Sequence, residues 1–176
     1  TLDMATYALN VTTPTNGGIL KTSATANPAF TTGKTWTGTV EFVALAGGQY
    51  VPAGTYTTLL FDNTSNTDTA GGIITTTNLT TTSGGTLDMA TYALNVTTPT
   101  NGGTLKTSAT ANPAFTTGKT WTGTVEFVAL AGGQYVPAGT YTTLLFDNTS
   151  NNDTAGGIIT ATNLTTTSGG TLDMAT

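Results

Sequence analysis

The sequence lacks cysteine, histidine and arginine, and only 7% of its 176 residues are charged. Without cysteine, a disulfide framework and thiol chemistry are excluded. Without histidine or cysteine, imidazole and thiolate metal sites and histidine-based nucleophile triads are also excluded. Four lysines against nine acidic residues give a net charge of −5, which leaves no basic surface for nucleic acid or an anionic membrane. We therefore expect a protein that is not an enzyme and has no cofactor.

Long apolar runs are missing too, since no segment approaches the roughly 20 apolar residues that span a bilayer. Membrane insertion is accordingly not expected. Helical periodicity is equally scarce, while Gly, Pro, Asn and Thr interrupt the chain every few residues. The apolar fraction is still 37%, and disordered chains combine lower hydrophobicity with higher net charge. The chain is predicted to fold, and to be all-β.

What the sequence does contain is a long tandem repeat. The segment TLDMATYALN begins at Thr1 and again at Thr86, and TLDMAT returns with the same spacing at Thr171. The two full copies differ only at Ile19/Thr104, Thr67/Asn152 and Thr76/Ala161. We interpret residues 1–85 as repeat 1, residues 86–170 as repeat 2 and residues 171–176 as the start of repeat 3, in a window from a longer array.

A phase slip in the repeated segment suggests how the chain turns. Leu87 and Met89 alternate with Asp88, but Tyr92, Leu94 and Val96 continue on the other parity. Because side chains alternate between the faces of a strand, a corner at residues 90–91 would let both halves point inward. A β-bulge or a hairpin would also explain the slip.

Glycine pairs recur along each repeat at intervals that suit a small parallel β-helix of four to five coils, each of about 17–21 residues. Tandem immunoglobulin-like sandwiches are the alternative, because seven short strands also fit in one repeat. In the solenoid, the next TLDMAT should continue the same ladder by a fixed translation, with a rise of roughly 19–24 Å per repeat. The three variable positions should be exposed. The predicted inward residues are Leu20, Trp36, Val40, Phe42, Tyr56, Leu60, Ile74, Leu87, Met89, Leu94 and Val96.

The segments SGGTLDMATYALNV and GGQYVPAGTYTTLLFDN resemble the Gly/Thr-rich tandem repeats of large bacterial surface proteins. That group includes β-helical adhesins and autotransporter-like passengers. The resemblance covers about half of each repeat and implies a parallel β-helix at the cell surface.

Three candidate sites compete with plainer interpretations. The loops Asp62–Asp68 and Asp147–Asp153 contain oxygen ligands for Ca²⁺, but they lack the EF-hand spacing and are typical of turns. Lys21 or Lys34, with Glu41 and a nearby Asn or Asp, would suit an isopeptide crosslink in an immunoglobulin-like fold. Thr-x-Thr runs such as residues 35–39 would suit the hydroxyl array of an ice-binding solenoid. However, the threonine rows do not recur at one fixed coil period in the sequence, and threonine has a high β-propensity in any case.

We expect a structural segment of a long extracellular fibre or adhesin stalk, which supplies reach and stiffness. Its expected partner is itself, end to end or laterally in a filament or biofilm matrix, with cell-surface glycans as a further candidate. The alternative function is a ligand-binding repeat module for glycan, calcium or ice.

Overall fold

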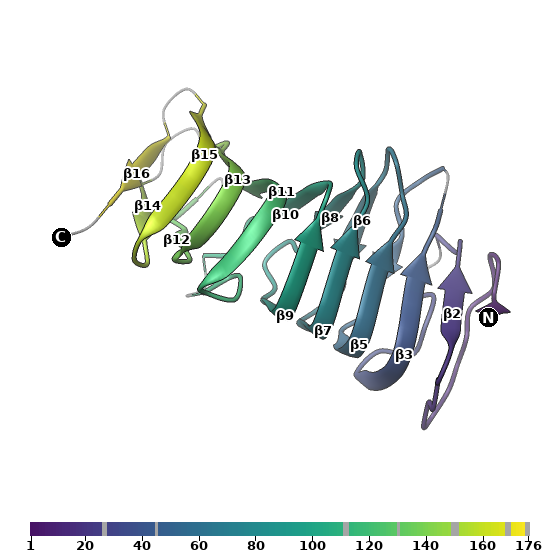
Figure 1. The fold of residues 1–176 in the computed structure, drawn as a ribbon. Coiled ribbons are helices and arrows are strands. Elements are labelled where there is room, and N and C mark those ends of the chain that lie inside the picture. Colours follow the sequence, from purple (N-terminus) through teal and green to yellow (C-terminus); the bar gives the residue numbers. More distant parts are fainter. Residues whose placement is uncertain are drawn as a thin grey trace.

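The computed structural model describes residues 1–25, 28–44, 46–110, 113–129, 131–148, 152–167 and 170–174. Every regular element among them is a β-strand, and every strand pairing is parallel, with partners 18 to 20 residues apart. Figure 1 shows the strands stacked along one axis, with the chain termini at opposite ends. The predicted β-solenoid is confirmed. The strands are β1 (Leu2–Asp3), β2 (Ile19–Thr22), β3 (Lys34–Phe42), β4 (Tyr50–Val51), β5 (Gly54–Phe61), β6 (Thr67–Ala70), β7 (Ile74–Thr81), β8 (Thr86–Asp88), β9 (Leu94–Asn101), β10 (Thr104–Thr107), β11 (Lys119–Phe127), β12 (Tyr135–Val136), β13 (Gly139–Phe146), β14 (Asn152–Ala155), β15 (Ile159–Thr166) and β16 (Thr171–Asp173).

Each turn of the solenoid carries three parallel ladders that follow one another along the chain. In β5, residues 54–56 pair with the first part of β7 and form ladder 1, whereas residues 58–61 pair with its second part and form ladder 2. The next strand, β6, pairs with β4 and β8 and forms ladder 3. The long strands of repeat 1 therefore supply two ladders each, β1 and β2 add to ladder 2, and β4 and β6 supply the third.

Changes of side-chain phase mark the corners between ladders. Met89 is buried, and beyond the corner at residues 90–91 Leu94 and Val96 are buried as predicted, whereas Tyr92, on the same parity, is 39% exposed. Ala90 adopts a left-handed backbone with φ 49°, and its N–H donates to the Asp88 carboxylate at 2.8 Å. A second slip lies inside β5, where Tyr56 is buried and the next buried residue is Leu59. Both halves of the strand thus point inward.

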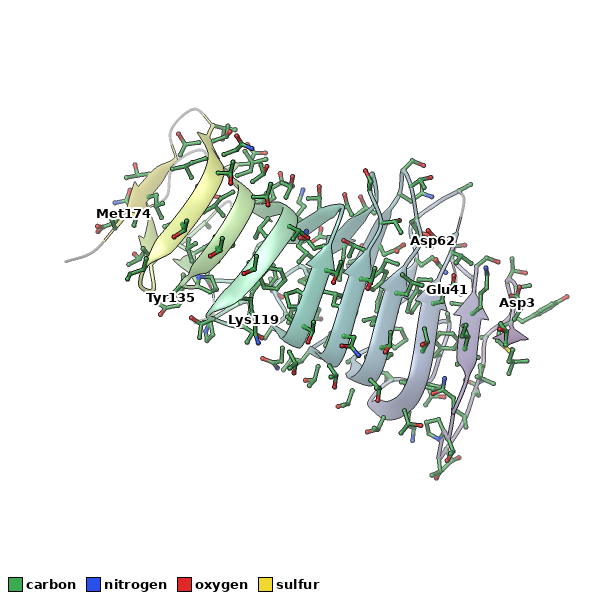
Figure 2. The ribbon with its side chains drawn as sticks, in the orientation of Figure 1. Asp3, Glu41, Asp62, Lys119, Tyr135 and Met174 are labelled. Carbon is green, nitrogen blue, oxygen red and sulfur yellow. The ribbon has the colours of Figure 1, made fainter. Side chains whose placement is uncertain are left out.

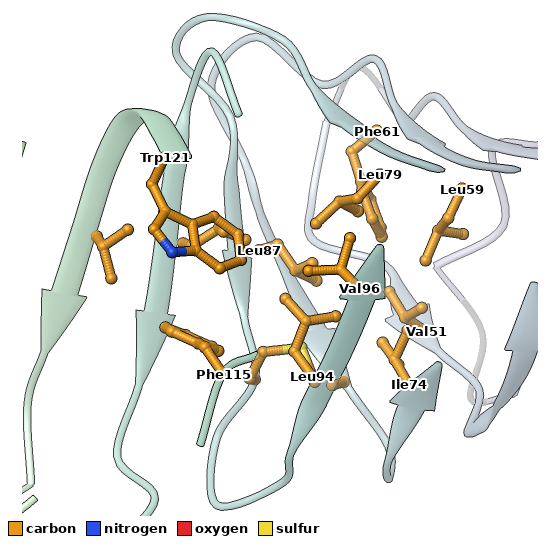
Figure 3. Close-up of a cluster of buried hydrophobic side chains, with 14 of the residues drawn as sticks. Val51, Leu59, Phe61, Ile74, Leu79, Leu87, Leu94, Val96, Phe115 and Trp121 are labelled. Atoms are coloured by element: carbon orange, nitrogen blue, oxygen red, sulfur yellow. The ribbon is translucent and has the colours of Figure 1, made fainter. Parts of the chain in front are cut away.

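The core is one continuous apolar column inside the coil (Figure 3). Ten of the eleven predicted inward residues are buried, and each contributes about 1.5–3 kcal/mol by removing apolar surface from water. Leu60 is the exception: it faces outward, while Leu59 and Phe61 are buried. The prediction is wrong there because the slip after Tyr56 reverses the parity of the rest of β5.

The two repeats do not superpose by a simple translation, and that prediction is wrong. β1 belongs to ladder 2, on the sheet that runs β1-β2-β3-β5-β7-β9. Its counterpart β8 lies on ladder 3, between β6 and β10. β16 joins β12 and β14 in a third sheet, on the remaining side of the coil. Equivalent strands therefore move by one ladder from each repeat to the next.

The physical reason is that one repeat is not a whole number of turns. Along ladder 3, four successive pairings lead from Asp88 to Thr165. The position equivalent to Asp88 in the next repeat is Asp173, which lies eight residues further along the chain. Those eight residues carry the chain around a corner to the next ladder. Each repeat thus makes about four and one third turns, with a rise of about 21 Å at about 4.8 Å per turn.

The variable positions are exposed in two of three cases. Ile19 is 41% exposed, Thr104 is partly exposed, and Thr67 and Asn152 are both exposed. Thr76 contradicts the prediction, because it is 2% exposed and its hydroxyl donates to the carbonyl of Asn78 at 2.9 Å. Thr76 shares the inward parity of Ile74, and its ladder partners Tyr56 and Val96 are also buried.

The two ends of the solenoid expose apolar residues that are buried elsewhere. Leu79 in β7 is fully buried, whereas its counterpart Leu164 in β15 is 55% exposed, since β13 is the only described strand that pairs with β15. At the opposite end Leu2 is 55% and Tyr7 is 74% exposed. Both ends are thus open surfaces of the core.

Candidate functional site

Two buried polar side chains connect neighbouring turns of the solenoid at one corner. The Gln49 amide donates to the carbonyls of Thr22 and Ala24 at 3.1 and 3.0 Å, and its oxygen accepts from the N–H of Ala44 at 2.7 Å. The N–H of Gln49 donates to the Asp68 carboxylate at 2.8 Å. Asp68 also accepts a hydrogen bond from the Asn63 amide. Gln134, Asp153 and Asn148 repeat the arrangement in the second copy.

Burial in this corner perturbs the carboxyl group. Asp68 is fully buried, and loss of hydration raises its pKa to about 6, although the hydrogen bonds from Gln49 and Asn63 lower it in part. The pKa of Asp153 is raised for the same reason. The side-chain oxygen of Asn63 is buried without a partner among the described residues. Loss of hydration, which favours the protonated carboxyl, therefore outweighs the two hydrogen bonds, which favour the carboxylate.

We expect the chain to be more stable at pH 4.5 than at pH 7.5. In the folded state the carboxyl has a pKa of about 6 and keeps its proton between about pH 4 and pH 6. In the unfolded chain its pKa is about 3.9, so it is ionised over the same range. Its stabilisation is full below about pH 4 and is lost as the pH rises through 6. At about 1.4 kcal/mol per pKa unit, Asp68 contributes about 1–3 kcal/mol. Urea unfolding at the two pH values measures the difference.

The matched variant is Asp68→Asn combined with Asp153→Asn. Asparagine keeps an oxygen for the N–H of Gln49 and does not titrate, so the pH dependence should flatten while stability at pH 7.5 is retained. An equal pH dependence in the variant would rule out these two carboxyls as its source.

Most of the exposed charge of each repeat forms a charged row along one ladder. In repeat 2, Asp88 pairs with Lys106, and Lys106 pairs with Glu126, while Asp147 lines the same shallow surface depression as Lys106. Burial raises the pKa of Glu126; Lys106 lowers it, and Asp147 and Asp88 raise it further. Figure 2 shows the counterparts Asp3, Glu41 and Asp62 near the N-terminal end of the solenoid.

The lysines are engaged in ordinary polar contacts. Lys21 Nζ lies 3.8 Å from Glu41 Oε1 in a partly exposed ion pair. Lys34 Nζ donates to the carbonyl of Thr12 at 2.7 Å, on a neighbouring turn. The isopeptide hypothesis depended on an immunoglobulin-like fold, which the solenoid replaces. Both contacts join neighbouring turns, and an ion pair at this exposure adds at most about 1 kcal/mol.

The candidate calcium loop does not bring its carboxylates together. Asp62 is exposed and, together with Lys21, lines a shallow surface depression of repeat 1. Asp68 is buried instead and accepts a hydrogen bond from the N–H of Gln49. In the second copy, residues 149–151 of the loop Asp147–Asp153 lie outside the described residues. Within the part of the chain that the structure describes, no group of three or more acidic side chains is placed to hold a metal ion.

The outward side of ladder 1 carries two columns of threonine, which we call the threonine array. Thr35, Thr55, Thr75 and Asn95 are successive ladder partners. Residues 37, 57, 77 and 97 recur at the same sequence interval and lie beyond those pairs, at the corner between ladders 1 and 2. All eight side chains are exposed. The array consists of Thr35, Thr37, Thr55, Thr57, Thr75, Thr77, Asn95 and Thr97, and its counterpart in repeat 2 consists of Thr120, Thr122, Thr140, Thr142, Thr160 and Thr162.

The objection that threonine rows lack a fixed period is therefore wrong for the rows from residue 35 to residue 97 and for those from residue 120 to residue 162. The rows recur every 20 residues, and the interval widens only from residue 95 to residue 120, where the equivalent strands change ladder. Thirteen of the fourteen positions are threonine, whereas outward positions of ladder 2 are mixed and include Glu41, Leu60 and Asn78. β-propensity alone does not explain why one side is so uniform.

The chain was also compared with known proteins. No helix among the described residues is long and apolar enough to cross a membrane. Comparison with protein-family models, with curated proteins and with solved structures finds no match to this chain.

Proposed function

We propose that this chain is a structural segment of a long extracellular fibre or adhesin stalk. The observation that carries the proposal is the continuity of the ladders across the repeat boundary. β7 of repeat 1 pairs with β9 of repeat 2 over their full length, and β6 pairs with β8. Residues 67–101, all of them described, contain no linker at which the two copies could bend, so added repeats lengthen one stiff rod.

The composition and contacts support a mechanical role. Buried side chains such as Gln49 and Asn101 bond to the backbone of neighbouring turns: the Asn101 amide donates to Thr124 at 3.2 Å and accepts from Gly123 at 3.0 Å. Such contacts resist sliding and separation of the coils. The Gly/Thr-rich segments resemble those of bacterial surface repeats, which supports an extracellular location.

Self-association end to end is part of this proposal. In the interior, residues 94–101 cover β7, and the same sequence occurs at residues 9–16 near the start of the chain. β15 has the sequence of β7 apart from Ala161, and no described strand pairs with its outer edge. Unpaired edges beside exposed apolar residues favour strand addition. Residues 9–16 of a second copy would therefore cover β15.

Small-angle X-ray scattering of chains with two, four and six repeats tests the stalk. We expect the length to grow by about 21 Å per repeat at a constant cross-section, since each repeat adds about four and one third turns. Growth by some 35–45 Å per repeat, as in a string of sandwich domains, or a coil-like dependence on repeat number would contradict the proposal.

A further inference from the structure

The threonine array presents a regular two-dimensional pattern on the outside of the solenoid. Rows are about 4.8 Å apart, because they follow the ladder, and the two columns are about 6.6 Å apart, because they are two residues apart on each strand. Parallel in-register pairing keeps the spacing of the first column constant from Thr35 to Asn95. The second column lies at the corner just beyond these pairs, and in β3 the register shifts there, between Trp36 and Thr39. Each threonine offers one methyl group and one hydroxyl, and the hydroxyl both donates and accepts hydrogen bonds.

The hydroxyls in the middle of the array are available to an outside partner. Among the described residues, no hydrogen bond engages the hydroxyls of Thr55, Thr57 or Thr77. The hydroxyl of Thr75 accepts from the Asn95 amide at 3.5 Å, and Thr37, at the first row, donates to the carbonyl of Asn16 at 3.1 Å. A shallow trough between the columns is lined by Thr55, Thr75 and Thr97, among others. It is also lined by Tyr56, Thr76 and Val96, whose side chains are buried, so that their backbone forms its floor. The trough is able to hold water in a row.

The array lacks the groups that recognise other candidate ligands. It contains no carboxylate for a cation and no charged residue for an ion. Its aromatic neighbours Trp36 and Tyr56 are 1% exposed, so they offer no flat ring on which a sugar could stack. What remains is an uncharged surface of equally spaced hydroxyl and methyl groups. A partner that uses it fully must itself repeat every few ångströms in two directions.

We propose that the threonine array is an ice-binding surface. Ice is a periodic array of water molecules that donate and accept hydrogen bonds at spacings of a few ångströms. Waters held in the trough and on the hydroxyls are already ordered by the ladder, so little further entropy is lost when they join the crystal. Each row contributes weakly, and the rows act together because the solenoid holds them rigidly in register. The array in repeat 2 lies one ladder away around the coil.

Partition into growing ice tests the proposal with the chain as it is. A fluorescently labelled chain is mixed with serum albumin, and a slowly growing ice hemisphere is then analysed for both proteins. We expect the chain to be enriched in the ice at least tenfold over albumin, and ice recrystallisation to be inhibited. A chain that is excluded from ice to the same extent as albumin overturns the proposal without any variant.

The variants locate the surface. Thr55→Lys with Thr75→Lys, together with Thr140→Lys, should reduce enrichment at least tenfold by breaking the columns. The matched control is Thr67→Lys with Thr69→Lys and Thr154→Lys, at exposed outward positions of the short strands. Thermal melting verifies that each variant is folded. If the array variant is not, Thr55→Val with Thr75→Val and Thr140→Val replaces it; if the control variant is not, Thr67→Val with Thr69→Val and Thr154→Val replaces that one. Equal losses of ice enrichment in the array and control variants would contradict the assignment of ice binding to this surface. Binding to crystalline cellulose together with exclusion from ice would show that the ligand is not ice.

Discussion

Replacing Gly103 by alanine should lower the free energy of unfolding by about 3 kcal/mol or more, whereas the same change at Gly18 should have almost no effect. The two glycines occupy the same position in the two repeats. A Cβ on Gly103 would lie 2.3 Å from the carbonyl oxygen of Gly85 and 2.6 Å from that of Thr82. Both oxygens belong to backbone of the preceding turn, so the coils would have to separate. A Cβ on Gly18 meets no atom within 4 Å.

Urea unfolding followed by circular dichroism measures both variants. Since glycine loses more backbone entropy than alanine on folding, Gly18→Ala should be neutral or gain up to about 0.5 kcal/mol. Similar losses in the two variants would show that the two positions have the same surroundings, which contradicts the stacking of repeat 2 on repeat 1.

A second large difference is expected between Leu79→Ala and Leu164→Ala. Leu79 is fully buried and pairs with Leu59 on one side and Pro99 on the other. Removing its side chain should cost about 2–5 kcal/mol, because a cavity remains in the core. Leu164 is already 55% exposed, so its removal should cost less than about 1 kcal/mol.

Unfolding midpoints of the two variants give this comparison directly. The local sequences around the two leucines match closely, so intrinsic strand propensity cancels. If Leu164→Ala were as destabilising as Leu79→Ala, the end of the solenoid would be covered in solution, for example by a second copy. At high dilution, where copies dissociate, the destabilisation by Leu164→Ala should then fall below that by Leu79→Ala.

The sequence predicts the fold class well because a corner leaves a visible trace. Between Met89 and Leu94 the apolar residues change parity, and the structure places a turn of the coil there. The slip inside β5 leaves no such trace, since Thr57 and Thr58 are equally compatible with either side of a strand. The pattern therefore assigns Leu60 to the core in place of Leu59.

The relation between repeat and turn is less accessible from the sequence. A tandem repeat suggests a unit that stacks by translation, yet the pairing of β8 with β6 shows a shift by one ladder. This shift depends on the number of residues at each corner, which local patterns do not fix. The same shift makes the threonine array hard to recognise in the sequence, because the regular spacing of Thr35, Thr55 and Thr75 is interrupted before Thr120.

The central claim is that the two repeats form one solenoid in which equivalent strands move by one ladder. Cysteine crosslinking tests it most directly, because the chain has no cysteine of its own. Thr69 and Asp88 are ladder partners in different repeats, and neighbouring strands are about 4.8 Å apart, within the range that a disulfide spans. Asp3 is the counterpart of Asp88 but pairs with Lys21 on ladder 2. We expect Thr69→Cys with Asp88→Cys to close an intramolecular disulfide rapidly and completely, and Thr69→Cys with Asp3→Cys to remain reduced; failure of the first pair, or equal closure of both, would contradict the claim.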